Sequence, residues 1–299
     1  MKTFQLKHNT ALILALALFA FFTAPAVYAR SADAQWKTTV VYGQKIRYLE
    51  AGSGPTVILL HGLGGSAALW APTIAPLAKT HRVIVPDQIG FGSSAKPLID
   101  YRVATLVDFL DGFYKNLKIK RASLVGNSLG GFTAAAFALA HPEKVDRLVL
   151  VGSAGFALPK DFDPRALDFL NPSTRAGMKQ VLEAIFYDKE RFATDAAAND
   201  FFIKKLASGD GYTVQRFLAS ILKGEDVLDG KLGALKHPTL LVWGREDALT
   251  PLSLGERFKN EIPNSELFII DKCGHVPQLE KPEEFNAAVL KFLKRPASP

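Results

Sequence analysis

The sequence predicts an α/β protein in which a mostly parallel central sheet carries helices on both faces and is interrupted by an all-helical cap. From residue 56 onward, short apolar runs alternate with segments of helical periodicity, the order typical of parallel sheets. These runs are apolar along their whole length, as expected of strands buried on both faces. The alternation stops at residue 153 and resumes near residue 238, and the segment between shows no strand pattern.

Before this alternation, residues 38–42 and 45–49 are expected to form paired strands around a turn at Gly43 and Gln44. The later strands are expected at residues 56–60, 82–86, 122–126, 147–151, 240–243 and 267–270, and helices at residues 67–79, 101–116, 131–140 and 282–293. Residues 30–152 and 237–299 then form the core domain. Residues 153–236 form a helical cap inserted between two strands, and we expect it to cover the edge of the sheet.

The first 29 residues are expected to be an export signal. Lys2 and Lys7 supply a basic start, residues 11–22 form an apolar run, and Val27 and Ala29 occupy the two positions that a signal peptidase reads. An uncleaved membrane anchor is the alternative, because residues 11–29 carry no charge and are nearly long enough to span a bilayer. We therefore expect a periplasmic or secreted protein, with membrane contact only through this segment if it stays uncleaved.

Charge and cysteine content disfavour several functions. The formal charge of +7 becomes +5 without the two lysines of residues 1–29, and basic residues do not cluster with aromatic ones. Nucleic acid is therefore a poor candidate partner. Cys273 is the single cysteine, so the chain forms no intramolecular disulfide and a thiolate metal site is not expected. We predict neither a metal nor a cofactor, and the sequence does not indicate an oligomeric state.

A candidate nucleophile lies at Ser128, because residues 126–130 match the pattern G-x-S-x-G. The pattern alone is weak evidence. Here it follows an apolar run of strand length and opens a helical segment at Gly131. A sharp turn between strand and helix exposes the serine hydroxyl, and we therefore predict that Ser128 attacks the substrate.

A serine hydroxyl needs a base, and the base needs a carboxylate to orient it. His275 follows the last expected strand, at the carboxyl edge where parallel sheets place their sites. Asp247 follows the strand at 240–243, and we prefer it to Glu246, which we expect to face solvent. Ser128, Asp247 and His275 therefore form the predicted triad.

The oxyanion of the tetrahedral intermediate needs backbone N–H donors. Leu129 follows the nucleophile and supplies one of them. We assign the second to Leu63, in the glycine-rich turn at residues 61–65 that follows the first core strand. His61 is expected to hold this turn in place.

The cap is rich in phenylalanine, and most of these side chains are expected to pack the cap onto the core. Some should line an apolar pocket over the site, where this architecture places its ligand. The predicted pocket residues are Trp70, Phe156, Phe201, Phe202 and Phe217.

Taken together, these motifs resemble the α/β-hydrolases with a helical cap, from about residue 38 to residue 293. The resemblance is carried by residues 61–65 with Trp70, residues 87–94, the turn at Ser128, residues 244–247, and residues 274–275. The motifs are specific for the fold and the triad but not for the substrate. The resemblance also implies that residues 87–94 form a structural turn near the site.

Within this family the nucleophile divides the activities. Haloalkane dehalogenases and epoxide hydrolases use aspartate, whereas esterases, lipases, C–C hydrolases of aromatic-ring catabolism, haloperoxidases and perhydrolases keep the serine. Asn127 before Ser128 is similar to the C–C hydrolases, but those usually carry an aromatic residue at the position of Val276 and work in the cytosol. Residues 153–156 and 274–277, with the expected export, look more like bacterial esterases and lipases.

The leading prediction is therefore hydrolysis of a small carboxylic ester with an apolar acyl group, through an acyl-enzyme on Ser128. A C–C bond hydrolase with the same triad is the first alternative. A catalytically silent protein that binds an apolar ligand is the second, and the complete triad argues against it. A peptidase releasing terminal residues is the third, and the cap shows no acidic cluster to hold a substrate amine.

Overall fold

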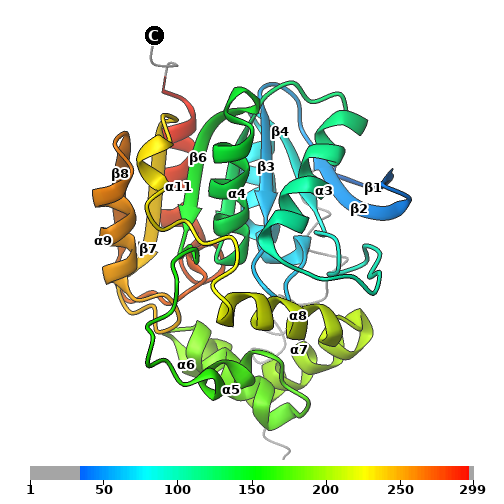
Figure 1. The fold of residues 1–299 in the computed structure, drawn as a ribbon, viewed down its shortest axis with the longest axis vertical. Helices are drawn as coiled ribbons and strands as arrows, with labels where there is room; N and C mark the ends of the chain where they lie inside the picture. Colours follow the sequence, from blue (N-terminus) through cyan, green and yellow to red (C-terminus); the bar gives the residue numbers. More distant parts are fainter. Residues whose placement is uncertain (1–33, 296–299) are drawn as a thin grey trace, which may run out of the picture.

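The fold is built on one twisted sheet of eight strands (Figure 1), in a computed structural model that describes residues 34–295. The expected export signal lies outside the described residues. The strands lie in the order β1-β2-β4-β3-β5-β6-β7-β8. Their bounds are β1 Gln35–Val41, β2 Gln44–Ala51, β3 Thr56–Leu60, β4 Arg82–Pro86, β5 Ala122–Asn127, β6 Val145–Val151, β7 Thr239–Gly244 and β8 Ser265–Ile270.

The first two strands form an antiparallel hairpin whose turn lies one residue earlier than expected. Val41 pairs with Gln44, so the turn residues are Tyr42 and Gly43, with φ of 50° and 76°. Positive φ at both positions suits the twist of a two-residue hairpin. β2 is also antiparallel to β4, whereas all neighbouring strands from β4 to β8 are parallel. The prediction of a mostly parallel sheet is therefore confirmed.

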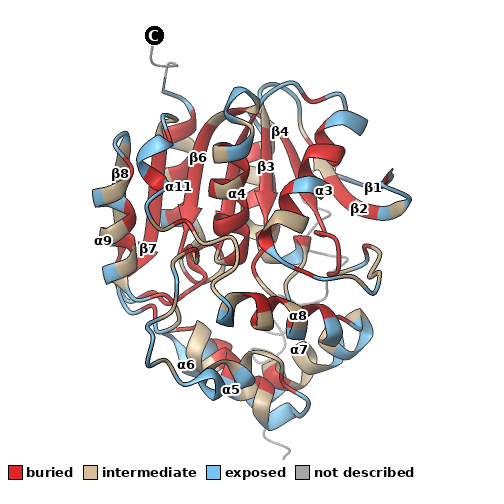
Figure 2. Ribbon diagram, in the orientation of Figure 1, coloured by how far each residue is buried: buried red, intermediate tan, exposed pale blue. Residues whose placement is uncertain are grey.

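The central strands bury both faces, which explains their unbroken apolar sequences (Figure 2). In β3, Val57 and Leu59 join the core on one side of the sheet, and Ile58 and Leu60 join the core on the other. Successive strand residues point to opposite faces. Because both faces are covered, apolar residues are favoured at every position.

Helices cover both faces, as predicted. One face carries α3 (Val103–Asn116), α4 (Leu129–Ala140) and α9 (Leu252–Glu261), and the other carries η1 (Ala67–Trp70), α2 (Ala71–Ala78) and α11 (Pro282–Leu293). The sequence pattern did not predict α9, which buries only Gly255 and Phe258. Shorter turns are η2 (Pro142–Lys144), η4 (Leu232–Ala234) and α10 (Pro277–Glu280).

The segment between β6 and β7 is helical, as expected, and every residue of it is described. It contains η3 (Pro164–Leu170), α5 (Arg175–Ile185), α6 (Lys189–Phe192), α7 (Asp195–Ser208) and α8 (Gly211–Leu222). These helices lie across the carboxyl ends of the parallel strands (Figure 1). The chain enters and leaves the cap side by side, because the Leu228 N–H donates to the Gly155 carbonyl at 2.8 Å.

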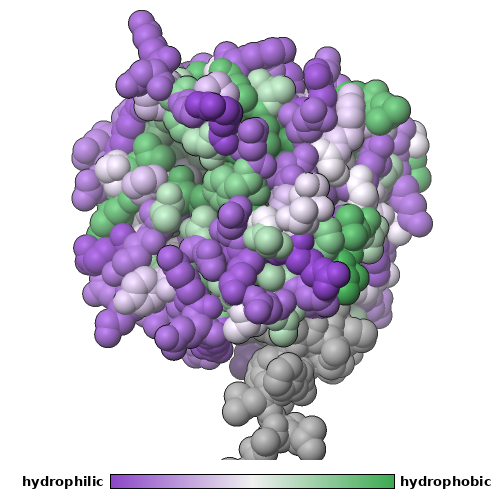
Figure 3. Space-filling model, turned by 90° about the horizontal axis from the view of Figure 1, so that it is seen from below, coloured by the Kyte–Doolittle hydropathy of each residue, from purple (hydrophilic) through white to green (hydrophobic). Residues whose placement is uncertain are grey.

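The outer surface of the cap mixes polar and apolar side chains (Figure 3). Ile203 and Leu206 of α7 and Tyr212 of α8 are exposed there. Within residues 34–295, no helix has both the length and the apolar character that crossing a membrane requires.

Candidate active site

Ser128 forms the sharp turn between β5 and α4. Its φ of 56° and ψ of −117° give the strained conformation expected of a nucleophile at a strand–turn–helix junction. The flanking glycines are sterically required. A Cβ on Gly126 would lie 2.2 Å from the Gly130 carbonyl oxygen, and one on Gly130 would lie 2.1 Å from that of Leu60. The Ser128 N–H also donates to the Val151 carbonyl at 2.9 Å, which fixes the turn to β6.

His275 and Asp247 are buried together beyond the ends of β8 and β7. The His275 Nδ1–H donates to Asp247 Oδ2 at 2.8 Å. Asp247 Oδ1 accepts the N–H groups of Leu249 and Thr250, both at 2.9 Å, and these bonds orient the carboxylate. Gly152 leaves room for the pair, because a Cβ there would lie 3.0 Å from Asp247 Oδ2 and 3.2 Å from His275 Nδ1. With the proton on Nδ1, Nε2 is the nitrogen that can accept the serine proton.

Asn127 ties the predicted nucleophile to the loop of the predicted base. Its Nδ2 donates to the His275 carbonyl at 3.0 Å and to the Val151 carbonyl at 3.1 Å. The predicted oxyanion turn adjoins the same place, since a Cβ on Gly62 would lie 3.2 Å from the Ser128 Cβ. The structure thus gathers the predicted triad and the turn at one edge of the sheet. The sequence analysis noted Asn127 only as part of the motif, because its partners lie far away in the chain.

His61 holds the predicted oxyanion turn from behind. Its Nδ1–H donates to the Gly62 carbonyl at 2.8 Å, and its Nε2 accepts the Gln88 N–H at 3.0 Å. Burial lowers the pKa of His61, which keeps the ring neutral as this pattern requires. Leu63 lies in this turn, and Leu129 opens α4, where the first N–H groups of a helix lack intrahelical partners. The role of Leu63 and Leu129 as oxyanion donors stays a prediction.

The turn at residues 87–94 is held by the carboxylate of Asp87. Its Oδ1 accepts the Ala67 N–H and its Oδ2 accepts the Ser93 N–H, both at 2.8 Å. A Cβ on Gly92 would lie 2.4 Å from the Asp87 Cγ, so this position requires glycine. Both oxygens of Asp87 are thus engaged in holding backbone.

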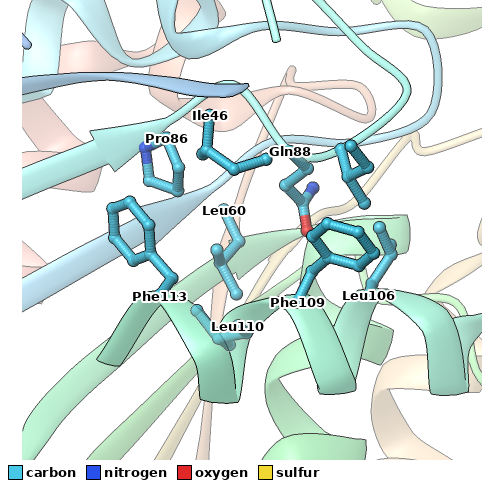
Figure 4. Close-up of a pocket in the computed structure, with 9 residues that line it drawn as sticks. Ile46, Leu60, Pro86, Gln88, Leu106, Phe109, Leu110 and Phe113 are labelled. Atoms are coloured by element: carbon cyan, nitrogen blue, oxygen red, sulfur yellow. The ribbon is translucent and has the colours of Figure 1, made fainter. Parts of the chain in front are cut away.

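A small apolar pocket lies behind this turn, between the sheet and α3 (Figure 4). Gln88 contributes its polar part, and the Gln88 Nε2 donates to the His61 carbonyl at 2.8 Å. The pocket therefore borders the support of the oxyanion turn. The pocket is also lined by Ile46, Leu60, Pro86, Leu106, Phe109, Leu110 and Phe113.

The structure corrects the pocket role predicted for Trp70, whereas the role of Phe156 stays a prediction. Trp70 has no exposed surface and packs against Phe285 of α11, on the other side of the sheet from α4. The η1 turn directs this ring into the core. Phe156 packs against Phe258 of α9, with a centroid distance of 4.6 Å, and the Arg257 guanidinium lies 3.7 Å from its ring centre. Phe156 therefore packs where the chain enters the cap.

Phe217 of α8 serves mainly to dock the cap. Only 1% of it is exposed, and its ring lies 5.7 Å from the rings of both Phe91 and Tyr101. These two residues belong to the core domain. Phe217 is thus part of the continuous hydrophobic core, which a sequence pattern could not distinguish from a pocket wall.

Phe201 of α7 packs near the loop of the predicted base. It is half-buried and packs against a small cluster that includes Phe186, Phe192 and Val276. Val276 directly follows His275. Phe202 is also half-buried on α7, and its place in a substrate pocket stays a prediction.

The remaining candidate groups near the site are structural. Glu246 is exposed, as expected, but its Oε2 also accepts the Cys273 N–H at 3.0 Å. Burial raises the pKa of the Cys273 thiol, so this thiol is not an activated nucleophile. Among residues 34–295, no group of three His, Cys, Asp or Glu side chains is arranged to hold a metal ion.

Comparison with known proteins assigns the family. The family model described as "alpha/beta hydrolase fold" matches residues 55–282. The chain belongs to the α/β-hydrolase family. The match spans strands β3 to β8, the cap and the predicted triad, and it makes the protein a hydrolase.

Relatives of this α/β-hydrolase include enzymes that act on ring-cleavage products. A 2-hydroxy-6-oxo-6-(2'-aminophenyl)hexa-2,4-dienoic acid hydrolase from Metapseudomonas resinovorans is 36% identical over 85% of this chain and 89% of its own length. A solved meta-cleavage product hydrolase is 31% identical, with a TM-score of 0.78 over 86% of this chain and 97% of that one. A solved bacterial membrane phospholipase A is 28% identical, with a TM-score of 0.81 over 90% of this chain and 89% of that one.

Proposed function

We propose that this α/β-hydrolase cleaves a carbon–carbon bond in a 2-hydroxy-6-oxo-dienoate, the kind of compound that ring cleavage of a catechol produces. The observation that carries the proposal is the similarity, over most of both chains, to hydrolases named for such substrates. It favours the alternative of the sequence analysis over the ester hydrolase that led there. The serine turn with its buried histidine–aspartate pair supports the chemistry.

In the proposed reaction Ser128 Oγ attacks the ketone carbon and gives its proton to His275 Nε2. The N–H groups of Leu63 and Leu129 stabilise the oxyanion. When the tetrahedral intermediate collapses, the bond to the neighbouring carbon breaks. This cleavage requires the 2-keto tautomer of the substrate, in which the 2-hydroxyl proton has moved to the carbon next to the ketone before the attack. The electron pair is then delocalised through the remaining double bond onto the 2-keto oxygen, which receives the proton from His275 and leaves as a 2-hydroxydienoate. Water, activated by His275, then hydrolyses the acyl-enzyme and releases a carboxylic acid.

Ester hydrolysis is the second candidate, and two observations favour it. The phospholipase structure matches this chain with a TM-score slightly above that of the meta-cleavage product hydrolase. Val276 stands where the C–C hydrolases that the sequence resembles usually carry an aromatic residue. The same triad serves both reactions, because only the leaving group differs: an alcohol oxygen or a carbon.

A comparison of kcat/KM for the two classes of substrate tests the proposal. The purified protein is given 2-hydroxy-6-oxo-6-phenylhexa-2,4-dienoate, whose loss of visible absorbance reports cleavage, and separately a series of nitrophenyl esters of increasing acyl length. We expect kcat/KM for the dienoate to exceed that for the best ester by about 100-fold or more, because a site that hydrogen-bonds the polar groups of one substrate discriminates strongly against substrates that lack them. The reverse ranking would establish the esterase.

Ser128→Ala is the control for both assays. Removing the nucleophile should lower either activity by about 10⁴-fold. A variant that keeps more than a few per cent of the wild-type rate would show that Ser128 is not the nucleophile.

A further inference from the structure

A buried carboxylate lies under the loop that carries the base. The single turn of α10 follows His275 and ends at Glu280, which is only 4% exposed. The turn folds back so that Glu280 Oε2 accepts the Gly274 N–H at 2.6 Å. Its other oxygen, Oε1, accepts the Asp188 N–H at 2.7 Å. Gly274 belongs to the loop of the base, and Asp188 belongs to the cap.

The cap meets the same loop directly. The His275 N–H donates to the Ile185 carbonyl at 2.7 Å. The contact is too tight for a side chain, since a Cβ on Gly274 would lie 2.3 Å from that Ile185 oxygen and 2.9 Å from the Tyr187 nitrogen. Val276 adds apolar packing against the cap. Residues 185–188 and 274–276 are therefore held together by direct contacts.

A carboxylate this buried is costly unless hydrogen bonds compensate its lost hydration. Among residues 34–295 no lysine, arginine or histidine pairs with Glu280 within salt-bridge distance. The two backbone N–H groups are its strong donors, with the Cys273 thiol as a weaker neighbour. Hydrogen bonds to a charged acceptor are stronger than neutral ones. One partner lies on each side of the junction between the cap and the core.

We infer that Glu280 is a positioning residue, which sets the place of His275 by clamping its loop to the cap. Asp247 orients the ring of His275, and Glu280 with the Ile185 carbonyl fixes its backbone. The position of His275 then depends on how the turn between α5 and α6 packs against its loop. The inference rests on the proposed function only in requiring that His275 acts as the base for Ser128.

Glu280→Gln tests this role while keeping the shape of the side chain. One of the two N–H groups then faces an amide NH₂ and loses its acceptor. Because a small misplacement of a catalytic group lowers the rate steeply, we expect kcat to fall about tenfold or more, with KM within about threefold. Labelling of Ser128 by a fluorophosphonate, which needs the same base but no particular substrate, should slow in the same proportion.

Glu284→Gln is the matched control. It removes the same charge from an exposed side chain in the first turn of α11, and both kcat and the labelling rate should stay at the wild-type level. Gly274→Ala perturbs the junction from the other side, by pushing the Ile185 carbonyl away. We expect it to reproduce the loss of kcat and the slow labelling.

The amount of labelled serine at completion separates positioning from folding. If Glu280→Gln only reduces the fraction of protein that can be labelled, and the remaining protein reacts at the wild-type rate, the inference is wrong and Glu280 is merely structural. Equal labelling rates and kcat in Glu280→Gln and wild type also overturn it while leaving the proposed function intact. A wild-type protein that resists labelling overturns both.

Discussion

At the scale of single residues, the site depends on a few positions where backbone conformation and side-chain chemistry agree. A non-glycine residue at the positive φ of Ser128 costs on the order of 1–2 kcal/mol. The packing of β5, α4 and the flanking glycines holds it there. The same logic applies to Gly152, whose φ of 47° and missing side chain leave space for the histidine–aspartate pair.

The two neighbouring acids Asp247 and Glu246 should behave differently on substitution. Asp247→Asn removes the charge that orients His275, and its amide favours the wrong tautomer of the ring. We expect turnover to fall by about 10⁴-fold. Glu246→Gln changes an exposed side chain that accepts one N–H, and its effect should stay within about threefold.

Steady-state kinetics of the two variants, with circular dichroism to confirm folding, measure this ranking. A larger loss of kcat in Glu246→Gln than in Asp247→Asn would mean that the acid has been misassigned.

At the scale of elements, the cap divides into a docked part and a more exposed part. α8 buries five residues against the core, Phe217 among them, whereas the longer α7 buries only Ala198. The end of α5 and the turn before α6 are hydrogen-bonded to the segment that carries the predicted base. Selectivity is therefore expected to depend on the inward aromatic residues of α7, and cap stability on α8.

Two phenylalanine substitutions separate these roles. Phe217→Ala should lower the free energy of unfolding by about 3–5 kcal/mol, the usual cost of deleting a buried aromatic ring. Phe202→Ala, at a half-buried position of α7, should cost about 1 kcal/mol or less and instead change KM across substrates with different acyl groups. Urea unfolding and the substrate profile are the two measurements.

If Phe202→Ala leaves the substrate profile untouched, and Phe201→Ala does as well, then α7 does not form part of the pocket. If the free energy of unfolding of Phe217→Ala equals that of the wild type, the contacts of the Phe217 ring with Phe91 and Tyr101 do not hold α8 against the core.

At the scale of the whole molecule, two buried histidines link stability to pH. Burial lowers the pKa of His61 and also that of His81. Above the unfolded-state pKa, near 6.5, both rings are neutral in the folded and unfolded chains, and stability is fully present. As the pH falls below that value the unfolded chain takes up protons that the folded chain does not, so stability is lost.

We therefore expect the free energy of unfolding to fall between about pH 7 and about pH 5, by at most about 1.4 kcal/mol per pH unit for each histidine. Urea unfolding at several pH values measures it. His81→Gln should reduce the slope without abolishing it, because His61 remains. A stability that is flat over this range would contradict the assignment of both rings as neutral and buried.

The N-terminal segment gives a second prediction at this scale. Its basic start, apolar run and small residues near Ala29 favour cleavage and export. We expect protein isolated from its native host to begin at or near Arg30 and to be found outside the cytoplasm. Edman sequencing and cell fractionation check this, and recovery of intact Met1 in the membrane fraction would instead identify an anchor.

The sequence by itself determined the fold class and the helical insertion, and it led to the prediction of the triad. These features depend on local patterns. Unbroken apolar runs indicate strands that are covered on both faces, and a serine flanked by glycines indicates a tight turn between a strand and a helix. The positions of Asp247 and His275 followed from their places just beyond strand ends, since parallel strands bring those ends to one edge.

Only the tertiary structure decided which side chains surround these residues. Asn127 reaches the His275 carbonyl across 148 residues of sequence, and Glu280 joins the cap to the base loop through bonds that no local pattern encodes. For the same reason Trp70 was misplaced: an aromatic residue near a motif can point into the core or into a pocket, and neither outcome changes the sequence pattern. Long-range packing makes that choice, because the burial of an apolar ring depends on all its neighbours at once.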